Sequence, residues 1–342
     1  MRKCLLSNSS ALFAEIAKNA RLYIPVDIEN GCVAYREYTD GAVMSDALKT
    51  DRSAKDFFFP QTQNLMEFKV DGKNIEVVDN REESEDFVVF GVRGCDVKSL
   101  QVLDKVFLAE PVDSYYANRR EHGIIVSMAC DRPVETCFCQ TFGVDASAPD
   151  GDIVCYKTKD AFYLDGKTEK GKALLSKLDG VTEQADEKVV EEQKASIKEI
   201  LNRLPLKDLK ADAFGKDTTD KFFNAPEWKT LSESCLGCGT CTFVCPTCQC
   251  YDIRDFKTKN GVQRYRCWDS CMYSEFTKMS AGQPRISQLE RFRQRFMHKL
   301  VYFPTNNDGT FSCVGCGRCI SKCPISMNIV KVMKTLGGEN ND

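Results

Sequence analysis

The sequence predicts an α+β protein with two domains: a mixed α/β domain over residues 1–215, then a mainly helical domain over residues 221–342. The chain has 342 residues, more than a single hydrophobic core usually serves. In the first domain, β-branched segments alternate with amphipathic ones, which indicates a mixture of strands and helices. The second domain holds twelve of the nineteen cysteines, so it is expected to carry most of the chemistry.

Local patterns predict the elements of the first domain in order. The first twenty residues, "MRKCLLSNSSALFAEIAKNA", look like an amphipathic helix. Strands are predicted where β-branched residues stand between turn or charged residues: "RLYIPV", "GCVAYREYT", "NIEVVD", "DFVVFGV" and "GIIVSMAC". Helical spacing predicts a helix over "DVKSLQVLDKVFLA", and "DIVCYKTKDAFYLDGKT" is typical of a hairpin. A charged amphipathic helix is expected from about residue 182 to 204, followed by a linker rich in Pro, Lys and Asp.

Composition argues against several functional classes. Lys and Arg total 47 against 50 Asp and Glu, and the net charge of −3 argues against nucleic acid as the main partner. No run of about 18 apolar residues is present, so no membrane span is expected. The N-terminus lacks the long apolar region of an export signal, which predicts a cytoplasmic protein. In a reducing compartment, nineteen cysteines indicate metal or redox chemistry, and two histidines supply few ligands for mixed Cys/His zinc sites.

The second domain contains two copies of one cysteine motif. "CLGCGTCTFVCP" and "CVGCGRCISKCP" both follow the spacing C-x2-C-x2-C-x3-C-P, which is specific for iron–sulfur clusters. Three thiolates on one tight loop reach three corners of a [4Fe–4S] cube, and the small glycines let backbone N–H groups approach the sulfurs. A pair of zinc sites is the alternative, and it is less favoured because zinc sites usually use C-x2-C pairs.

The fourth cysteine of each motif is expected to serve the other cluster. This crossed ligation is the rule in two-cluster ferredoxins, so the domain is predicted to be ferredoxin-like. The first cluster is assigned to Cys235, Cys238, Cys241 and Cys323, and the second to Cys313, Cys316, Cys319 and Cys245.

A long insert of 67 residues, from Pro246 to Ser312, separates the two motifs and is expected to be largely helical. Its segment "SQLERFRQRFMHKL" places four apolar residues on one helix face: Leu289, Phe292, Phe296 and Leu300. Two interpretations, which are compatible, apply to the cations of the same segment, Arg291, Arg293, Arg295 and Lys299. They form a solvated face, or they compensate the negative charge of a cluster and tune its potential.

Stretches in both halves resemble the sulfhydrogenase beta-subunit family, to which one of the subunits of anaerobic sulfite reductase also belongs. They are "KDFFFPQTQNLMEF", "VRGCDVKSLQVLDKVFL" and "CFCQTFG" in the first half, and "CPTCQCYDI", "RYRCWDSCMYSEFTKMSAGQPR" and "RFRQRFMHKLVYF" in the second. The resemblance covers nearly the whole chain. It implies a non-catalytic subunit that relays electrons between a flavin subunit binding NAD(P) and a catalytic subunit. That catalytic subunit is a nickel–iron hydrogenase, a sulfite reductase or another oxidoreductase.

A third cluster is predicted in the first domain. The stretch "CDRPVETCFC" holds Cys130, Cys137 and Cys139 within ten residues, and Cys95 is the expected fourth ligand. Cys95 and Cys130 each follow a predicted strand, and neighbouring parallel strands would deliver both thiols to one edge of the sheet. Residues at i and i+2 of an extended segment face the same way, which suits Cys137 and Cys139. A four-cysteine zinc site and scattered buried thiols are the alternatives.

The remaining cysteines are expected to have lesser roles. Cys4, Cys32 and Cys155 are predicted to be small buried hydrophobes. A second group is expected mainly to pack around the two clusters, with a further metal site as the alternative: Cys248, Cys250, Cys267 and Cys271.

A second function stays open, namely a self-contained reductase with a flavin or substrate pocket in the first domain. "KDFFFPQTQNL" offers Phe57, Phe58 and Phe59 to line such a pocket, although aromatic triplets more often belong to a core or an interface. The chain has no G-x-G-x-x-G after a predicted strand, and two histidines leave no Ser–His–Asp set. A flavin spectrum of the isolated chain would favour the reductase, and a bare iron–sulfur spectrum would favour the relay.

Overall fold

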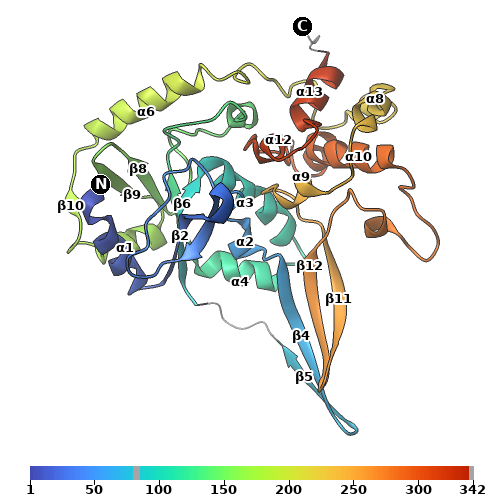
Figure 1. Cartoon of the computed structure of the whole chain (residues 1–342), viewed down its shortest axis with the longest axis horizontal. Coiled ribbons are helices and arrows are strands. Elements are labelled where there is room, and N and C mark those ends of the chain that lie inside the picture. The colour runs from blue at the N-terminus through green and yellow to red at the C-terminus, as the bar shows by residue number, and fades with distance from the viewer. Residues whose placement is uncertain (80–84, 339–342) are drawn as a thin grey trace.

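The computed structural model describes residues 1–79 and 85–338 (Figure 1). Its larger sheet has eight strands in the order β10–β1–β9–β8–β7–β6–β2–β3. These are β1 (Arg2–Leu5), β2 (Arg21–Ile28), β3 (Cys32–Glu37), β6 (Phe87–Arg93), β7 (Gly123–Met128), β8 (Ile153–Lys157), β9 (Ala161–Gly166) and β10 (Glu183–Gln184). The four strands β2, β6, β7 and β8 pair in parallel, and antiparallel strands flank them on both sides.

The central strand β6 shows why the sequence forms this sheet. All seven of its residues are buried, as expected for a parallel strand covered on both faces. Val88 and Phe90 pack against one apolar cluster and Phe87 and Val89 against another, so alternate side chains enter opposite layers. Because β6 pairs in parallel with β7, the residues that follow the two strands leave the sheet at the same edge. This confirms that the strands before Cys95 and Cys130 are neighbours.

Helices cover both faces of the larger sheet (Figure 1). They are α1 (Ser9–Ala17), α2 (Lys55–Phe58), α3 (Gly94–Phe107), α4 (Ser114–His122), α5 (Glu169–Ser176) and α6 (Lys188–Leu201). The prediction of a helix over the first twenty residues was wrong for residues 2–5, which pair with β9 as strand β1; the helix α1 begins at Ser9. An available strand edge outweighs the local helical pattern there.

A second sheet of four antiparallel strands extends away from the body (Figure 1). Its order is β11–β12–β4–β5, with β4 (Thr62–Asp71), β5 (Asn74–Asp79), β11 (Tyr251–Thr258) and β12 (Gly261–Trp268). The first two strands in sequence come from the predicted first domain and the other two from the insert, so one sheet joins both halves. The insert therefore begins with a hairpin, where the sequence analysis expected helix. "YDIR" and "RYRC" alternate apolar with polar residues at the strand period, and β4 offers β12 an edge for pairing.

The C-terminal helices share one core with the predicted linker. They are α7 (Thr219–Phe222), α8 (Glu227–Glu233), α9 (Thr240–Phe243), α10 (Gln288–Met297), α11 (Phe303–Asn306), α12 (Arg318–Ser321) and α13 (Ile329–Gly337), with a π-helical turn over His298–Tyr302. Ser287 and Glu290 form a capping box that starts α10. Phe292, Phe296 and Leu300 are buried together with Phe214 of the linker, so the linker is part of the core.

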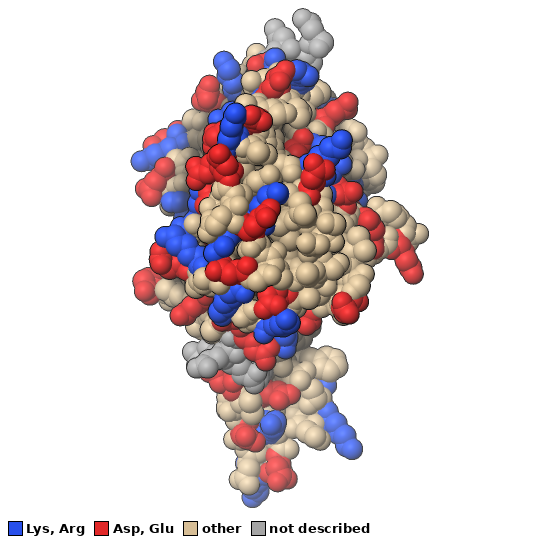
Figure 2. Space-filling view, turned by 90° about the vertical axis from the view of Figure 1, so that its left-hand side faces the viewer, with Lys and Arg blue, Asp and Glu red and all other residues tan. Residues whose placement is uncertain are grey.

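Lys and Arg side chains are interspersed with Asp and Glu over the face shown in Figure 2. No helix in residues 1–79 and 85–338 is long and apolar enough to cross a membrane.

Candidate functional site

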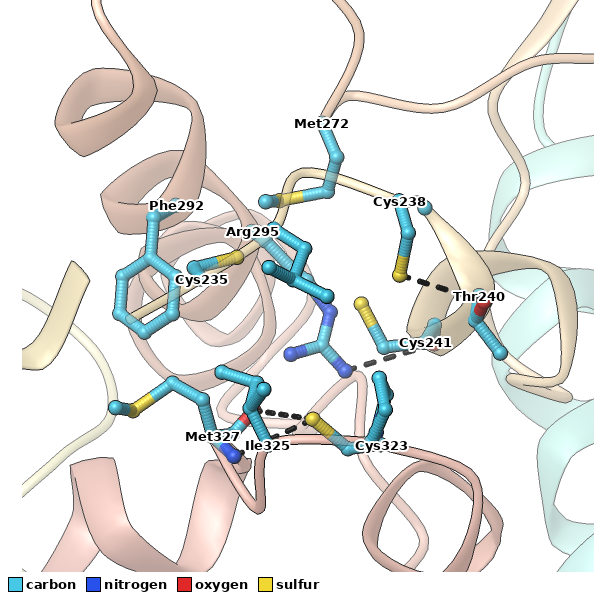
Figure 3. A pocket seen from close by; sticks show the side chains of 13 residues that line it. Cys235, Cys238, Thr240, Cys241, Met272, Phe292, Arg295, Cys323, Ile325 and Met327 are labelled. Atoms are coloured by element: carbon cyan, nitrogen blue, oxygen red, sulfur yellow. Dashed lines mark hydrogen bonds between the residues drawn. The ribbon is translucent and has the colours of Figure 1, made fainter. Parts of the chain in front are cut away.

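The first predicted set of thiols lies around one pocket (Figure 3). The loop before α9 and the start of α9 itself supply three of its cysteines, and the chain after α12 supplies the fourth: Cys235, Cys238, Cys241 and Cys323. The loop turns tightly because Gly237 and Gly239 adopt left-handed φ angles of 66° and 72°, which favour glycine. Gly315 and Gly317 of the second motif have φ angles of 60° and 74°, so the two motifs fold alike.

Neighbouring groups donate hydrogen bonds to thiols of this first set. The Gln288 amide Nε2 lies 3.4 Å from Cys235 Sγ, and the Met327 backbone N lies 3.3 Å from Cys323 Sγ. N–H groups aimed at sulfur stabilise a thiolate and influence the potential of any cluster that it ligates.

The second set gathers where the two motifs meet. Cys245 interacts electrostatically with all three cysteines of the second motif loop: Cys313, Cys316 and Cys319. Burial raises the pKa of the Cys319 thiol to about 11; Arg295 opposes the rise, and Cys316 and Cys245 add to it. The interactions of Cys319 also include Cys241 of the first set, so the two sets are adjacent. In both sets, the structure brings the fourth cysteine of one motif to the first three of the other.

The third predicted set also lines a single pocket, formed by Cys95, Cys130, Cys137 and Cys139. Cys95 lies in the first turn of α3 directly after β6, and Cys130 follows β7. Cys139 begins the 3-10 turn Cys139–Phe142, so the segment of Cys137 and Cys139 is not a plain extended strand. Within the described ranges, no group of three or more His, Cys, Asp or Glu side chains is arranged to hold a single metal ion.

The second and third sets are held in direct contact. The Phe138 N–H donates to the Gly315 carbonyl oxygen at 3.0 Å, and Cys316 lines the pocket of the third set. A Cβ at Gly315 would lie 2.3 Å from the Phe138 carbonyl oxygen, and a Cβ at Gly317 would lie 2.3 Å from that of Thr136. Only glycine lets the two loops approach so closely. The three sets thus follow one another, with the second in the middle.

Replacing Gly315 by Ala is expected to lower the free energy of unfolding by about 2–5 kcal/mol. About 1–2 kcal/mol comes from the left-handed backbone and about 1–3 kcal/mol from the forced contact with Phe138. Gly309→Ala is the matched control, because Gly309 has a φ of 78° and nothing within 4 Å of its would-be Cβ. Chemical denaturation under anaerobic conditions measures both variants. Equal losses would show that the contact between the loops contributes nothing.

Five buried cations lie beside the cysteine sets: Lys55, Arg93, Arg295, Lys299 and Arg318. Lys299 Nζ donates to Thr247 Oγ1 at 2.9 Å and to the Ser312 carbonyl at 3.0 Å. Burial alone lowers the pKa of Lys299, but Cys245 and Cys248 outweigh it, and the net shift is upward. Within the part of the chain that the structure describes, Lys55, Arg295 and Lys299 form no ion pair with a carboxylate. Buried charges need counterions, and cysteines are the groups that raise the pKa of Arg295 and Lys299 here.

The cations of the insert divide between the two interpretations. Arg295 and Lys299 are buried against the thiols, as charge compensation requires. Arg291 and Arg293 are only partly buried, and they donate to the carbonyls of Arg285 and Phe223. The helix therefore has one compensating face and one solvated face.

Two comparisons identify relatives of the chain. Residues 234–327 match the family model described as a 4Fe–4S dicluster domain. Over 331 residues the chain is 33% identical to sulfhydrogenase 2 subunit beta of Pyrococcus furiosus. The aligned region covers 94% of this chain and 93% of the relative. The chain belongs to the sulfhydrogenase beta-subunit family. No solved structure matches it. As a member of this family with a dicluster domain, the chain is an iron–sulfur electron-transfer protein.

The other cysteines of this chain, a member of the beta-subunit family, differ in their surroundings. Cys248, Cys250 and Cys271 interact with one another near the second set, whereas Cys267 lies on β12 beside charged residues and apart from them. The group of four suggested by the sequence therefore does not assemble. Cys4 and Cys155 are buried as predicted, but Cys32 is only partly buried.

Sequence reasoning missed two lysines of the first half. Lys49 Nζ donates to the Cys316 carbonyl at 2.5 Å and lies 3.9 Å from Cys137 Sγ, between the second and third sets. Lys55 Nζ donates to the carbonyls of Cys245 and Cys248 at 3.1 and 3.0 Å, and burial lowers its pKa to about 8. No local pattern marks these lysines, because their partners lie 88 to 267 residues away in the chain.

Proposed function

We propose that the chain is a non-catalytic electron-relay subunit of a cytoplasmic oxidoreductase complex. It passes single electrons between a flavin subunit that binds NAD(P) and a catalytic subunit such as a hydrogenase or a sulfite reductase. One observation carries the proposal: three sets of four cysteines lie side by side, from the surface at Cys238 to the sheet edge at Cys95.

The first two thiol sets fit the two clusters that the dicluster family model implies. The first two sets would each hold a [4Fe–4S] cluster through three cysteines of one motif and the fourth of the other, and the third set would hold a third cluster. Each cluster, when bound, takes up and releases one electron. The chain's own residues ligate the iron, exclude water and surround the thiolates with buried cations such as Arg295 and Lys299. The close contact between Gly315 and Phe138 sets the spacing between the second and third centres.

The self-contained reductase finds less support. Phe58 and Phe59 of "KDFFF" are fully buried in the core beneath the sheet, where they pack against Phe87, Phe107 and Trp268. They fill space that a flavin or substrate would need. The partner assignment rests on the family, because the matched relative is by name one of the subunits of a sulfhydrogenase.

Exchange of fourth ligands between the two motifs has a direct test. Cys323→Ala is expected to disturb the cluster of Cys235, Cys238 and Cys241, because Cys323 lines their pocket. Low-temperature EPR of the anaerobically reduced protein should show one altered signal. Cys245→Ala is the matched variant and should alter the other signal. Damage confined to the cluster of Cys313, Cys316 and Cys319 in the Cys323 variant would refute the exchange.

The relay is expected to turn over no substrate by itself. The anaerobically purified chain should consume none of NADH, NADPH, hydrogen or sulfite, although dithionite should reduce its clusters. Dithionite reduction is the control, because it shows that the clusters accept electrons. Steady consumption of any of the four substrates by the chain alone would contradict the proposed function.

A further inference from the structure

The first thiol set is the one that opens to the surface. Cys238 is the only exposed cysteine in residues 1–79 and 85–338; those of the second and third sets are partly or fully buried. Tunnelling between redox centres needs close approach, so an exposed ligand marks the point where an external centre can exchange electrons. This step rests on the relay function proposed above.

Four large apolar side chains are exposed on the loop that carries Cys238 and on the segment 273–288, which is hydrogen-bonded to that loop. Leu236, Tyr273, Met279 and Ile286 are 66%, 37%, 60% and 77% exposed, and we call them the collar. Leu236 lies in the first motif loop and lines the pocket of the first set. The Tyr273 hydroxyl donates to the Cys238 carbonyl oxygen at 3.2 Å, which fixes one end of the segment 273–288 against the loop.

The other end of that segment is fixed in the same way. Gln288 donates to Cys235 Sγ, and its side chain lies 3.0 Å from where a Cβ of Gly237 would be. Ile286 stands two residues before Gln288, and Met279 lies in the middle of the segment, where it bridges to Gly282. The collar therefore belongs to two segments that are hydrogen-bonded to each other at the exposed thiol.

Charges of both signs stand beside the collar, and Arg285, next to Ile286, is partly buried. Lys278 pairs with Glu275 at 3.0 Å, and the Glu290 carboxylate accepts from the Ser287 N–H in the capping box. Transient redox encounters are small and are steered by unpaired charge, whereas permanent subunit interfaces are apolar at their centre. An apolar surface with charges of both signs at its edge matches the second kind of partner.

We propose that the collar is the interface with a permanently bound redox subunit, which places its own one-electron centre opposite Cys238. One electron passes between that centre and the first cluster, in either direction, and no covalent bond forms or breaks. The second sheet carries another exposed apolar patch at Val70, Ile75 and Val77, but no cysteine set lies beside it, so it is not part of this electron path.

The test uses the full chain, affinity-tagged and expressed in its own organism. The double variant Met279→Asp/Ile286→Asp adds two charges to the collar at exposed residues that do not line the pocket of the first set. The control Val43→Asp changes an 80% exposed side chain in the first half, and Ile75→Asp changes the patch on the second sheet. Complexes are purified anaerobically, and the co-purifying subunits are quantified and analysed for flavin, iron and acid-labile sulfide.

Wild type and both controls are expected to retain a redox subunit in equal amount with the chain. The collar variant should retain at least tenfold less, with unchanged iron content and unchanged reduction by dithionite. Slower hydrogen exchange of residues 273–288 in the complex than in the free chain should accompany retention. Full retention in the collar variant would overturn the proposal, as would a retained subunit without flavin or iron, or a second copy of this chain on the collar. Catalysis by the isolated chain would refute the relay function and would leave the retention result intact.

Discussion

Replacing Cys139 by Ala is expected to reduce the iron content from about twelve to about eight atoms per chain, because each [4Fe–4S] cluster holds four. Cys139 is 8% exposed and shares one pocket with Cys95, Cys130 and Cys137. Burial raises the pKa of the Cys139 thiol to about 12, and Cys130 and Cys137 add to the rise. Four thiolates crowded in this way repel one another, and a cationic iron core removes that penalty.

The control for this variant is Cys155→Ala. Cys155 is fully buried on β8 in the apolar cluster that α1 and α5 form with the sheet, so its loss should leave the iron content unchanged. Iron and acid-labile sulfide are measured on protein reconstituted anaerobically. About eight irons in both the wild type and the Cys139 variant would refute a third cluster. One zinc per chain, lost in the Cys139 variant, would assign the site to zinc.

Replacing Arg318 by Met is expected to lower the free energy of unfolding by about 3–5 kcal/mol, since one partner of a buried ion pair is left without its counterion. Arg318 lies on α12 between Cys316 and Cys319, and both of its terminal nitrogens contact the Asp96 carboxylate, at 2.5 and 2.7 Å. Both side chains are almost fully buried, and Arg318 Nε also donates to the Thr50 carbonyl at 3.0 Å. This pair fixes the second motif to α3, which carries Cys95.

A double variant separates the ion pair from simple packing. Arg318→Met combined with Asp96→Asn should recover part of the loss, because no buried charge is then left alone. Arg203→Ala removes an exposed ion pair with Glu199 and should cost less than about 1 kcal/mol. Denaturant titration is carried out on samples whose iron content has been checked first. A cost for Arg318→Met as small as that for Arg203→Ala would show that the pair does not hold the halves together.

The sequence was most informative where chemistry fixes the spacing. The two motifs predicted which cysteines belong together, and the rule for parallel strands predicted that β6 and β7 would bring Cys95 and Cys130 to one edge. Both arguments use local spacing or the direction of neighbouring strands, which a single sequence contains. Ligation itself stays a prediction until the iron is measured.

Features that depend on distant partners were not predictable. The hairpin of β11 and β12 forms because β4, nearly 200 residues earlier in the chain, completes its sheet. Lys49 and Lys55 are ordinary polar residues in the sequence. They reach cysteines of the two motifs, Lys49 partly buried and Lys55 fully buried, only when the second half packs on the first. Cys267 stands four residues before Cys271 in the sequence. In the structure it lies on β12 among charged residues and apart from the other thiols.

Coulometric titration of the isolated chain tests the relay most directly. The chain is reconstituted anaerobically, and the electrons taken up are counted as the potential is lowered toward about −700 mV, the lower end of the range for such clusters. The account predicts about three electrons per chain, one for each [4Fe–4S] cluster, with no flavin absorbance at any potential. Uptake of two electrons, unchanged in Cys139→Ala, would remove the third centre, and a flavin signal would contradict the relay itself.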